Sequence, residues 1–176
     1  ATNPDYGFIF TAGMRGYDGN ATDSVAAALE ESIAALVKKI KESQILMLPG
    51  GSSGGDEPDG SGKFITAFFR NQAVKEQTEA LLQERDGLMI GICNGFQAII
   101  KLGLVPYGKI IEADETCPTV TFNAIGRHKA DIVRTRIASD KSPWLAKTKV
   151  GELFNVPISH GEGRFLCDAE LMKKLE

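Results

Sequence analysis

Hydrophobic side chains near the start of the chain recur at intervals of three and four residues. They are Val25, Leu29, Ile33, Leu36, Val37 and Ile40. This spacing places them on one face of an amphipathic helix. Thr22 or Asp23 suits the N-cap position, because a short side-chain oxygen can accept a hydrogen bond from the first turn. We therefore expect a helix that starts near these residues and is closed by Gln44.

Two short, continuous apolar runs predict buried strands. The first is ILML at residues 45–48, and the second is LMIGI at residues 88–92. Runs without polar alternation are typical of parallel strands that are covered on both faces. A second helical stretch lies between them, at residues 63–85, with a break expected at Asn71.

The order of these elements is strand, loop, helix, strand and helix, which is typical of a doubly wound α/β fold. We expect a mostly parallel sheet with helices on both faces. After Pro106 the pattern changes to short, partly alternating segments, TVTFNAIG, DIVRTRIAS and FNVPIS. These segments predict antiparallel strands or hairpins added to one edge of the sheet. Because the chain has no internal repeat and no low-complexity linker, we expect residues 1–176 to form a single domain.

Composition and charge argue against several classes of protein. Of 176 residues, 43% are hydrophobic and 24% are charged, and the net charge is −3. No dense basic run is present, so nucleic acid is not an expected partner. The apolar runs are too short to cross a bilayer, so no membrane partner is expected either.

The cysteines point to a reducing compartment. They are Cys93, Cys117 and Cys167, which are odd in number, widely spaced and without a CxxC motif. This pattern fits neither a disulfide framework nor a zinc site. We expect a cytoplasmic protein.

The segment GICNGFQ, from Gly91 to Gln97, carries the clearest chemical signal. It joins a predicted strand to a predicted helix that continues to Leu102 and is stopped by Gly103. A residue at such a turn lies at the carboxyl end of a parallel sheet, where α/β folds bind ligands. Glycines two positions before and after relieve the crowding, so G-x-C-x-G is the thiol analogue of the G-x-S-x-G nucleophile turn.

Cys93 is therefore a candidate nucleophile. The positive end of the helix that follows favours its thiolate form. The alternative is a small hydrophobic cysteine buried in a tight turn. An isolated G-x-C-x-G motif does not decide between these two interpretations.

A thiolate that attacks an amide needs N–H donors for the oxyanion. The backbone N–H of Asn94 is one candidate, because it follows the nucleophile. The turn PGG comes at the end of the adjacent predicted strand, where Gly50 and Gly51 let the backbone approach a ligand closely. Gly51 could supply the second N–H. The same loop lacks the Lys-Ser/Thr pair of a P-loop and carries several carboxylates, so phosphate binding is disfavoured.

Two histidines could supply the base, at positions 128 and 160. His160 comes just after an extended run, and Glu162 follows two residues later. In an extended chain these two side chains project to the same side. The carboxylate could then hold the imidazole while the ring moves a proton near Cys93. A hydrogen-bonded surface histidine is the alternative, and for His128 a structural or surface role is expected.

Together these motifs resemble the class I (triad) glutamine amidotransferases. GICNGFQ, PGG-x-S-x-GD and SHGEGRF are similar to the glutaminase components of phosphoribosylformylglycinamidine synthases, enzymes of de novo purine biosynthesis. The similarity extends over residues 45–166. The family usually opens with a P-G-T-N-C-type turn, which is not found in residues 1–20, and it continues beyond LMKKLE. We therefore expect a fragment of a longer polypeptide.

The resemblance implies a catalytic triad. Cys93 would attack glutamine, His160 would act as general acid and base, and Glu162 would orient the imidazole. Gly51 and Asn94 would form the oxyanion hole.

The resemblance also implies how the substrate is held and which partner is needed. Gln97 and Gly50 would help to bind glutamine. The released ammonia would pass to a synthetase domain or subunit of the same enzyme, and ATP and Mg would be used on that partner. No cofactor and no metal are expected in this chain itself.

Two alternatives stay open. Another cysteine α/β hydrolase of the same superfamily would share the nucleophile turn, although Gln97 and Glu162 count against it. A catalytically inert module that only binds a synthetase would also fit the sequence.

Overall fold

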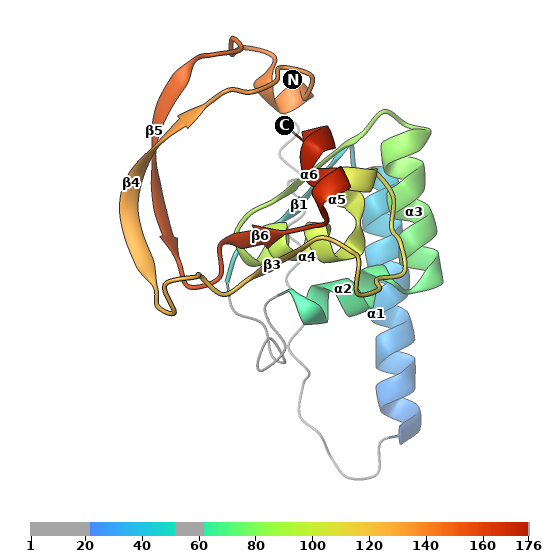
Figure 1. Cartoon of the computed structure of the whole chain (residues 1–176). Helices are drawn as coiled ribbons and strands as arrows, with labels where there is room; N and C mark the ends of the chain where they lie inside the picture. The colour runs from blue at the N-terminus through green and yellow to red at the C-terminus, as the bar shows by residue number, and fades with distance from the viewer. Residues whose placement is uncertain (1–21, 52–61, 176) are drawn as a thin grey trace. The chain divides into compact units, whose positions relative to one another are not determined.

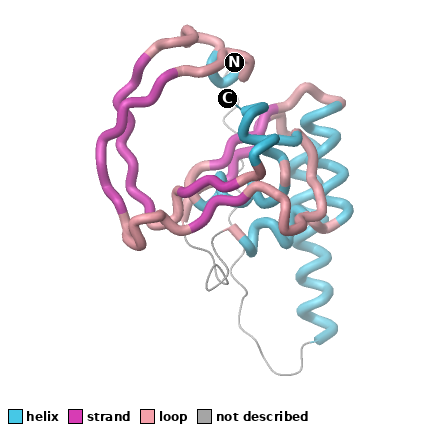
Figure 2. Tube along the Cα trace, in the orientation of Figure 1, coloured by secondary structure: helices cyan, strands magenta, loops and turns pink. Residues whose placement is uncertain are grey.

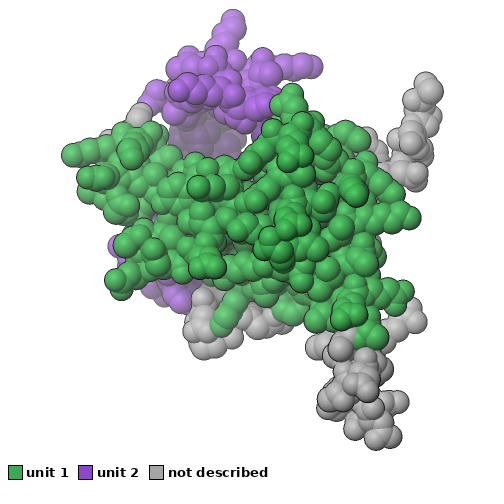
Figure 3. All heavy atoms as spheres, turned by 90° about the vertical axis from the view of Figure 1, so that its right-hand side faces the viewer, with its two compact units in different colours: residues 1–119, 167–176 green, residues 120–166 purple. Residues whose placement is uncertain are grey.

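The computed structural model describes residues 22–51 and 62–175 of the chain. The chain divides into two compact units, which Figure 3 draws in different colours. The first unit comprises residues 1–119 and 167–176, and the second unit comprises residues 120–166. This division does not test the prediction of a single domain, which stays a prediction.

The first unit contains the α-helices and a pair of parallel strands (Figures 1 and 2). Its described elements in chain order are α1 (Thr22–Glu42), β1 (Ile45–Leu48), α2 (Lys63–Phe69), α3 (Gln72–Gln83), β2 (Leu88–Gly91), α4 (Asn94–Leu102), α5 (Leu104–Tyr107) and α6 (Ala169–Leu175). The predicted helices and the two predicted strands are confirmed. None of the helices within the described residues is both long enough and apolar enough to cross a membrane.

Local chemistry explains where these helices start and stop. The expected break at Asn71 is confirmed, because this residue is the N-cap of α3. Its side-chain oxygen accepts hydrogen bonds from the backbone N–H groups of Ala73 (3.1 Å) and Val74 (3.5 Å). Gly103 ends α4 with φ 82°, a left-handed conformation that glycine adopts without strain.

A contact at the end of α1 joins residues far apart in the chain, and nothing in the sequence predicted it. The last carbonyl groups of a helix lack partners inside the helix. Arg85, which follows α3, donates hydrogen bonds to the backbone oxygens of Ile40 (2.9 Å), Lys41 (2.7 Å) and Ser43 (3.1 Å). Its positive charge is also favourable beside the negative end of the helix dipole. Arg85 therefore fastens the end of α3 to the end of α1.

β1 and β2 are parallel and paired in register, with Leu48 opposite Gly91. Leu46 and Leu48 are buried. Ile45 and Met47, on the other face, are 53% and 52% exposed. In the described part of the chain β1 therefore has one covered face, although its continuous apolar run predicted two. Because the strands are parallel, the residues that follow them meet at one edge.

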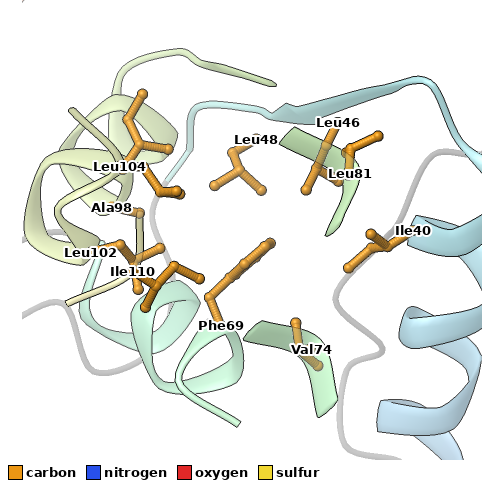
Figure 4. Packing of buried hydrophobic residues seen from close by; sticks show 11 residues of the cluster. Ile40, Leu46, Leu48, Phe69, Val74, Leu81, Ala98, Leu102, Leu104 and Ile110 are labelled. Carbon is orange, nitrogen blue, oxygen red and sulfur yellow. The ribbon is translucent and has the colours of Figure 1, made fainter. Parts of the chain in front are cut away.

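Side chains from the helices and strands of the first unit form a hydrophobic core. Its members are at most 9% exposed: Ile40, Leu46, Leu48, Phe69, Val74, Leu81, Ala98, Ile99, Leu102, Leu104 and Ile110. Figure 4 shows the ring of Phe69 extending into the space between Leu48, Val74 and Ile40. Each large side chain buried in this way stabilises the fold by about 1.5–3 kcal/mol. The core fixes α4 on β1 and β2, and so fixes the turn that precedes α4.

The second unit consists mainly of strands. Its elements are β3 (Thr119–Thr121, which begins in the first unit), β4 (Lys129–Arg136), the short 3-10 helix η1 (Pro143–Leu145), β5 (Leu153–His160) and β6 (Arg164–Leu166). β4 and β5 form a long antiparallel ribbon, visible in Figure 1, and β3 pairs with β6. The predicted antiparallel pairing is confirmed for β4 and β5. Within the described residues these strands form two-stranded sheets of their own and do not extend the parallel pair.

The second unit has almost no core. Val120 is its one buried residue, and large side chains of the ribbon such as Ile132 and Leu153 are 71% and 56% exposed. A two-stranded ribbon without a covered face is marginally stable in water. We therefore expect hydrogen bonds, and not buried apolar contacts, to hold the residues of this unit in place.

Candidate active site

Cys93 lies at the sharp turn between β2 and α4, as the sequence predicted. It is the N-cap residue of α4, with φ 54° and ψ −112°, and it is exposed. Positive φ is uncommon for a residue with a side chain and costs on the order of 1–3 kcal/mol. Such strain persists where the surrounding structure holds the residue in place, as it does in nucleophile turns.

The glycines that flank Cys93 are required by packing. A Cβ atom on Gly95 would lie 2.1 Å from the backbone oxygen of Leu48, and one on Gly91 would lie 2.6 Å from the backbone oxygen of Gly95. Both distances are far below van der Waals contact, and the neighbours are backbone atoms that cannot turn aside. The G-x-C-x-G motif is thus explained by excluded volume, because α4 begins too close to the end of β1 for any side chain.

The turn that follows β1 lies against the Cys93 turn. Ile92 donates its backbone N–H to the oxygen of Leu48 (3.0 Å), which extends the strand pairing by one bond. A Cβ atom on Gly50 would lie 2.9 Å from the Cβ atom of Cys93 and 3.7 Å from its Sγ. Gly51 follows with φ 122°, which favours glycine. The structure therefore brings the predicted PGG turn to the predicted nucleophile.

Gly62 also packs closely against the backbone of α4, and sequence reasoning did not single it out. It has φ 82°, and a Cβ atom on it would lie 2.8 Å from the backbone nitrogen of Ala98 and 3.2 Å from the backbone oxygen of Asn94. A glycine before a predicted helix is common, which is why it gave no signal. The acidic loop at residues 52–61 and the N-terminal residues 1–21 lie outside the described residues.

Asn94 and Gln97 belong to the N-terminal part of α4 and are buried, at 4% and 6% exposed. Gln97 donates its backbone N–H to the oxygen of Cys93 (3.0 Å), which closes the first turn of the helix. The N-terminus of a helix presents N–H groups and the positive end of the dipole, which suits a developing negative charge. The roles of Asn94 and Gly51 in an oxyanion hole and of Gln97 in substrate binding stay predictions.

His160 is the last residue of β5 and lies opposite Lys129 of β4. Its ring is half-buried, and Nδ1 lies 2.9 Å from the side-chain oxygen of Asn123. Asn123 comes shortly after β3, 37 residues before His160. Sequence reasoning missed Asn123, since asparagine after a short strand is a common turn residue and indicates nothing about a distant contact.

Glu162 lies in the turn between β5 and β6 and is half-buried. The sequence interpretation placed His160 just after an extended run and used extended geometry to put the Glu162 side chain on the same side. The structure continues β5 as far as His160, and the chain bends at Gly161. Strand alternation therefore does not set the direction of the Glu162 side chain, and its orienting role stays a prediction.

His128 is exposed, and its Nε2 lies 2.9 Å from the hydroxyl oxygen of Ser159. Ser159 belongs to β5, so this bond links the residue before β4 to the neighbouring strand. The contact agrees with the structural or surface role expected for His128.

The first unit also has a cavity of about 250 Å³, whose lining includes Lys63, Arg70, Lys101 and Asp114. None of the predicted site residues lines it. Within this lining, Asp114 accepts hydrogen bonds from the hydroxyl (2.7 Å) and the backbone N–H (2.8 Å) of Thr116. These bonds hold the pKa of the Asp114 carboxyl below its usual value.

Each unit therefore contains one part of the predicted site. The first unit brings Gly50 against Cys93, with Asn94 directly after it. The second unit brings His160 against Asn123. Cys93 and His160 belong to different units. The contacts described above are therefore those within each unit.

The fold and the site define an α/β protein with an exposed cysteine at a sharp, glycine-flanked turn between a strand and a helix. The chain belongs to the family described as the CobB/CobQ-like glutamine amidotransferase domain, whose model matches residues 10–176.

Among individual relatives, the chain is similar to the phosphoribosylformylglycinamidine synthase subunit PurQ of Methanococcus maripaludis strain S2. The two are 31% identical over 93% of this chain and 61% of that protein. The chain is also 31% identical to PurQ of Synechococcus sp. strain JA-2-3B'a(2-13), over 78% of this chain and 53% of that protein. The chain thus spans about half the length of the curated relatives it matches.

A solved structure supports the same relationship. The chain is similar to one chain of the structure of PurLQS from Thermotoga maritima, with a TM-score of 0.55 and 26% identity over 72% of this chain and 52% of that chain. The predicted α/β class and the resemblance to the glutamine amidotransferase components of phosphoribosylformylglycinamidine synthases are confirmed.

Proposed function

We propose that this chain is the glutaminase part of a phosphoribosylformylglycinamidine synthase. The observation that carries the proposal is the conformation of Cys93, an exposed thiol at positive φ and at the start of a helix. The glycines packed around it leave room for backbone but for no side chain. Membership of a glutamine amidotransferase family and similarity to proteins named as subunits of that synthase supply the substrate and the reaction.

The first half of the reaction is attack on glutamine. His160 takes the thiol proton of Cys93, and the sulfur attacks the side-chain amide carbon. The backbone N–H groups of Gly51 and Asn94 stabilise the oxyanion. His160 then gives its proton to the amide nitrogen, and ammonia leaves as the γ-glutamyl thioester forms. Gln97 and Gly50 help to hold glutamine during this step.

The second half is hydrolysis of the thioester. His160 takes a proton from a water molecule, which adds to the thioester carbon, and the thiol of Cys93 is restored as glutamate leaves. Glu162 supports the imidazolium form of His160 in both halves. The two halves together consume one glutamine and one water and release one glutamate and one ammonia.

The ammonia passes to a synthetase domain or subunit of the same enzyme, in the cytoplasm. That partner uses ATP with Mg to convert formylglycinamide ribonucleotide. No ATP or metal is assigned to the present chain. The similarity to a chain of the PurLQS structure supports a synthetase partner.

Two other functions predict different results. Another cysteine hydrolase of the superfamily would act on a substrate other than glutamine, without a synthetase. An inert synthetase-binding module would form no covalent intermediate at all. Each is distinguished from a glutaminase by what becomes attached to Cys93.

The test is covalent labelling of the chain together with its synthetase partner and nucleotide substrate. A glutamine analogue with a diazoketone side chain is expected to modify Cys93 and to spare Cys117 and Cys167. A γ-glutamyl thioester should be trapped on the same residue after mixing with glutamine. The matched control is Cys93→Ala, which should take no label and should keep ammonia-dependent synthesis. Equal labelling of the three cysteines, or no thioester, would contradict the proposal.

Release of glutamate by the chain alone is a second measurement. We expect slow hydrolysis, which rises strongly when the synthetase is supplied with its nucleotide substrate, since wasteful release of ammonia would defeat the coupling. Full-speed hydrolysis by the lone chain would instead indicate an independent hydrolase.

A further inference from the structure

The side chain of Asn123 lies at the centre of a hydrogen-bond network in the second unit. Its amide nitrogen donates to the backbone oxygens of His160 (2.8 Å) and Arg127 (3.0 Å). Its amide oxygen accepts from the backbone N–H of Gly163 (3.2 Å) and lies 2.9 Å from Nδ1 of His160. The backbone N–H of Asn123 also donates to the oxygen of Gly161 (2.8 Å). One residue thus joins the segment after β3 to both sides of the turn between β5 and β6.

The backbone partners determine which way the amide of Asn123 points. The carbonyl oxygens of Arg127 and His160 can only accept hydrogen bonds, so the atom that faces them must be the NH₂ group. The N–H of Gly163 can only donate, so the atom that faces it must be the amide oxygen. A flipped amide would put oxygen against two carbonyls and NH₂ against an N–H. The orientation is therefore set by backbone groups and does not depend on the histidine.

The oriented amide in turn determines the tautomer of the imidazole. An amide oxygen is an acceptor only, so a hydrogen bond with Nδ1 of His160 requires the proton to be on Nδ1. In a neutral ring with Nδ1 protonated, Nε2 carries the lone pair. Nε2 is then the nitrogen that is able to accept a proton from a substrate or a nucleophile.

Gly163 keeps the space that this arrangement needs. A Cβ atom at this position would lie 2.2 Å from Nδ1 and 2.3 Å from Cε1 of His160. Any side chain there would push the ring away from Asn123. The second glycine of the HGEG segment, Gly163, therefore belongs to the same arrangement as Asn123.

We propose that Asn123 is a positioning residue that fixes His160 as the Nδ1–H tautomer and so makes Nε2 the proton acceptor in glutamine hydrolysis. The catalytic consequence rests on the proposed glutaminase function, whereas the tautomer does not. Asn123 itself touches no reacting atom in this proposal. It acts through the neutral ring of His160, whereas Glu162 supports the imidazolium form in the proposed mechanism.

The first test is nuclear magnetic resonance of the full chain, labelled with ¹⁵N. The pH is kept above about 6.5, the ordinary pKa of a histidine side chain. The chain contains two histidine rings. Their signals in long-range ¹H–¹⁵N correlation spectra are therefore few enough to assign the tautomer of each ring. In the wild-type chain, His160 is expected to show a protonated Nδ1 and an unprotonated Nε2. A proton on Nε2 of neutral His160 would overturn the proposal without any variant being needed.

Variants then identify the residue responsible. Asn123→Ala should remove the preference, so that the two nitrogens of His160 shift toward averaged values. Glu162→Gln should leave the protonated Nδ1 in place. A switch of tautomer in Glu162→Gln, with none in Asn123→Ala, would transfer the positioning role to the carboxylate and overturn the proposal.

Ser159→Ala is the matched control, because it removes the partner of the other ring. It should change the signals of His128, whose Nε2 lies 2.9 Å from the Ser159 hydroxyl, and leave the tautomer of His160 as it was. If it also altered the tautomer of His160, the preference would come from the strand end and not from Asn123.

The second test is the kinetics of the chain assembled with its synthetase partner. For Asn123→Ala we expect kcat with glutamine to fall about 10- to 100-fold, KM for glutamine to stay within about 2-fold, and ammonia-dependent synthesis to be unchanged. A rise in KM at constant kcat would mean that Asn123 serves binding, and would overturn the catalytic part. If the wild-type enzyme used no glutamine, the proposed function would fail, while the spectra would still decide the tautomer.

Discussion

The two units hold their chemical groups by different physical means. In the first unit a buried core (Figure 4) fixes the strands and α4. Glycines there let the backbone of the Cys93 turn pack with no side chain between. In the second unit the ribbon is open, Val120 is the one buried residue, and His160 is placed by hydrogen bonds through Asn123. The candidate nucleophile is positioned by excluded volume, and the candidate base is positioned by polar contacts. Changes of volume should therefore be felt most in the first unit, and changes of polarity in the second.

The largest effect that we expect is a difference in hydrogen exchange between the units. Amides of α4, which lies over the core, should be protected on the order of 10³-fold more than amides of β4 and β5, because local opening of the ribbon exposes little new apolar surface. Hydrogen exchange of the full chain, followed by mass spectrometry or NMR, measures this directly. Equal protection would show that the ribbon is as stable as the core and would remove the contrast.

Gly95→Ala tests positioning by volume. The new Cβ atom would lie 2.1 Å from the backbone oxygen of Leu48, so α4 must move away from β1. We expect a loss of about 3 kcal/mol in the free energy of unfolding, at the upper end of overpacking costs. Urea unfolding measures it. The control is Gly161→Ala, which has no atom within 4 Å of the added carbon and should change stability by less than about 1 kcal/mol.

Gly163→Ala tests positioning by polar contacts. The added carbon meets the ring of His160 and not the backbone, so the ring can move and stability should fall by only about 1 kcal/mol. The hydrogen bond from Nδ1 to Asn123 should be lost, and glutamine turnover of the assembled enzyme should fall about 10²-fold, because the ring is misplaced. Urea unfolding and glutamate release measure the two effects. A large loss of stability with normal turnover would reverse the assignment.

The smallest effect concerns two exposed carboxylates, one in each unit. The hydroxyl and N–H of Thr116 hold the pKa of Asp114 below the usual value for an aspartate, about 3.8. The N–H of Ile132, aided by Lys129, does the same for the pKa of Asp131. A lowered folded-state pKa contributes stability above about pH 3.8 that is lost as the pH falls through the folded value. Asp114→Asn and Asp131→Asn should therefore make stability slightly less dependent on pH below about 4. Urea midpoints between about pH 2 and 5 measure the change, and a steeper acid loss would contradict it.

The parts of the site that the sequence predicted are those that carry a recognisable local motif. The break at Asn71 is set by backbone N–H groups two and three residues later. The glycines around Cys93 belong to a known turn motif, so they were expected even though Gly95 packs against the distant Leu48. Asn123 and Arg85 were missed, since their partners lie 37 and up to 45 residues away. A polar side chain gives no sign of a distant backbone partner in a single sequence.

The fold was predicted in class but not in every pairing. The alternation of helices and apolar runs predicted the parallel pair, and α4, which follows β2, packs against both strands. The continuous run at β1 predicted two covered faces, whereas Ile45 and Met47 stay half exposed in the described chain. Apolar composition shows that a strand can be buried, and it does not show what covers it. The extended run that the sequence interpretation ended before His160 likewise includes His160 as the last residue of β5, and the chain bends at Gly161.

The amide of Asn123 also bears on how the protein ages. Spontaneous hydrolysis turns an asparagine into an aspartate, and asparagine is among the residues that limit the survival of proteins at high temperature. At this position the product would place a carboxylate oxygen against the backbone oxygens of Arg127 and His160, which the amide nitrogen now contacts at 3.0 and 2.8 Å. Two attractions would become repulsions at the turn that carries the candidate base. Among the asparagines of the described chain, Asn123 is thus a position where hydrolysis of a single side-chain amide would displace the imidazole of His160 while leaving the core of the first unit intact.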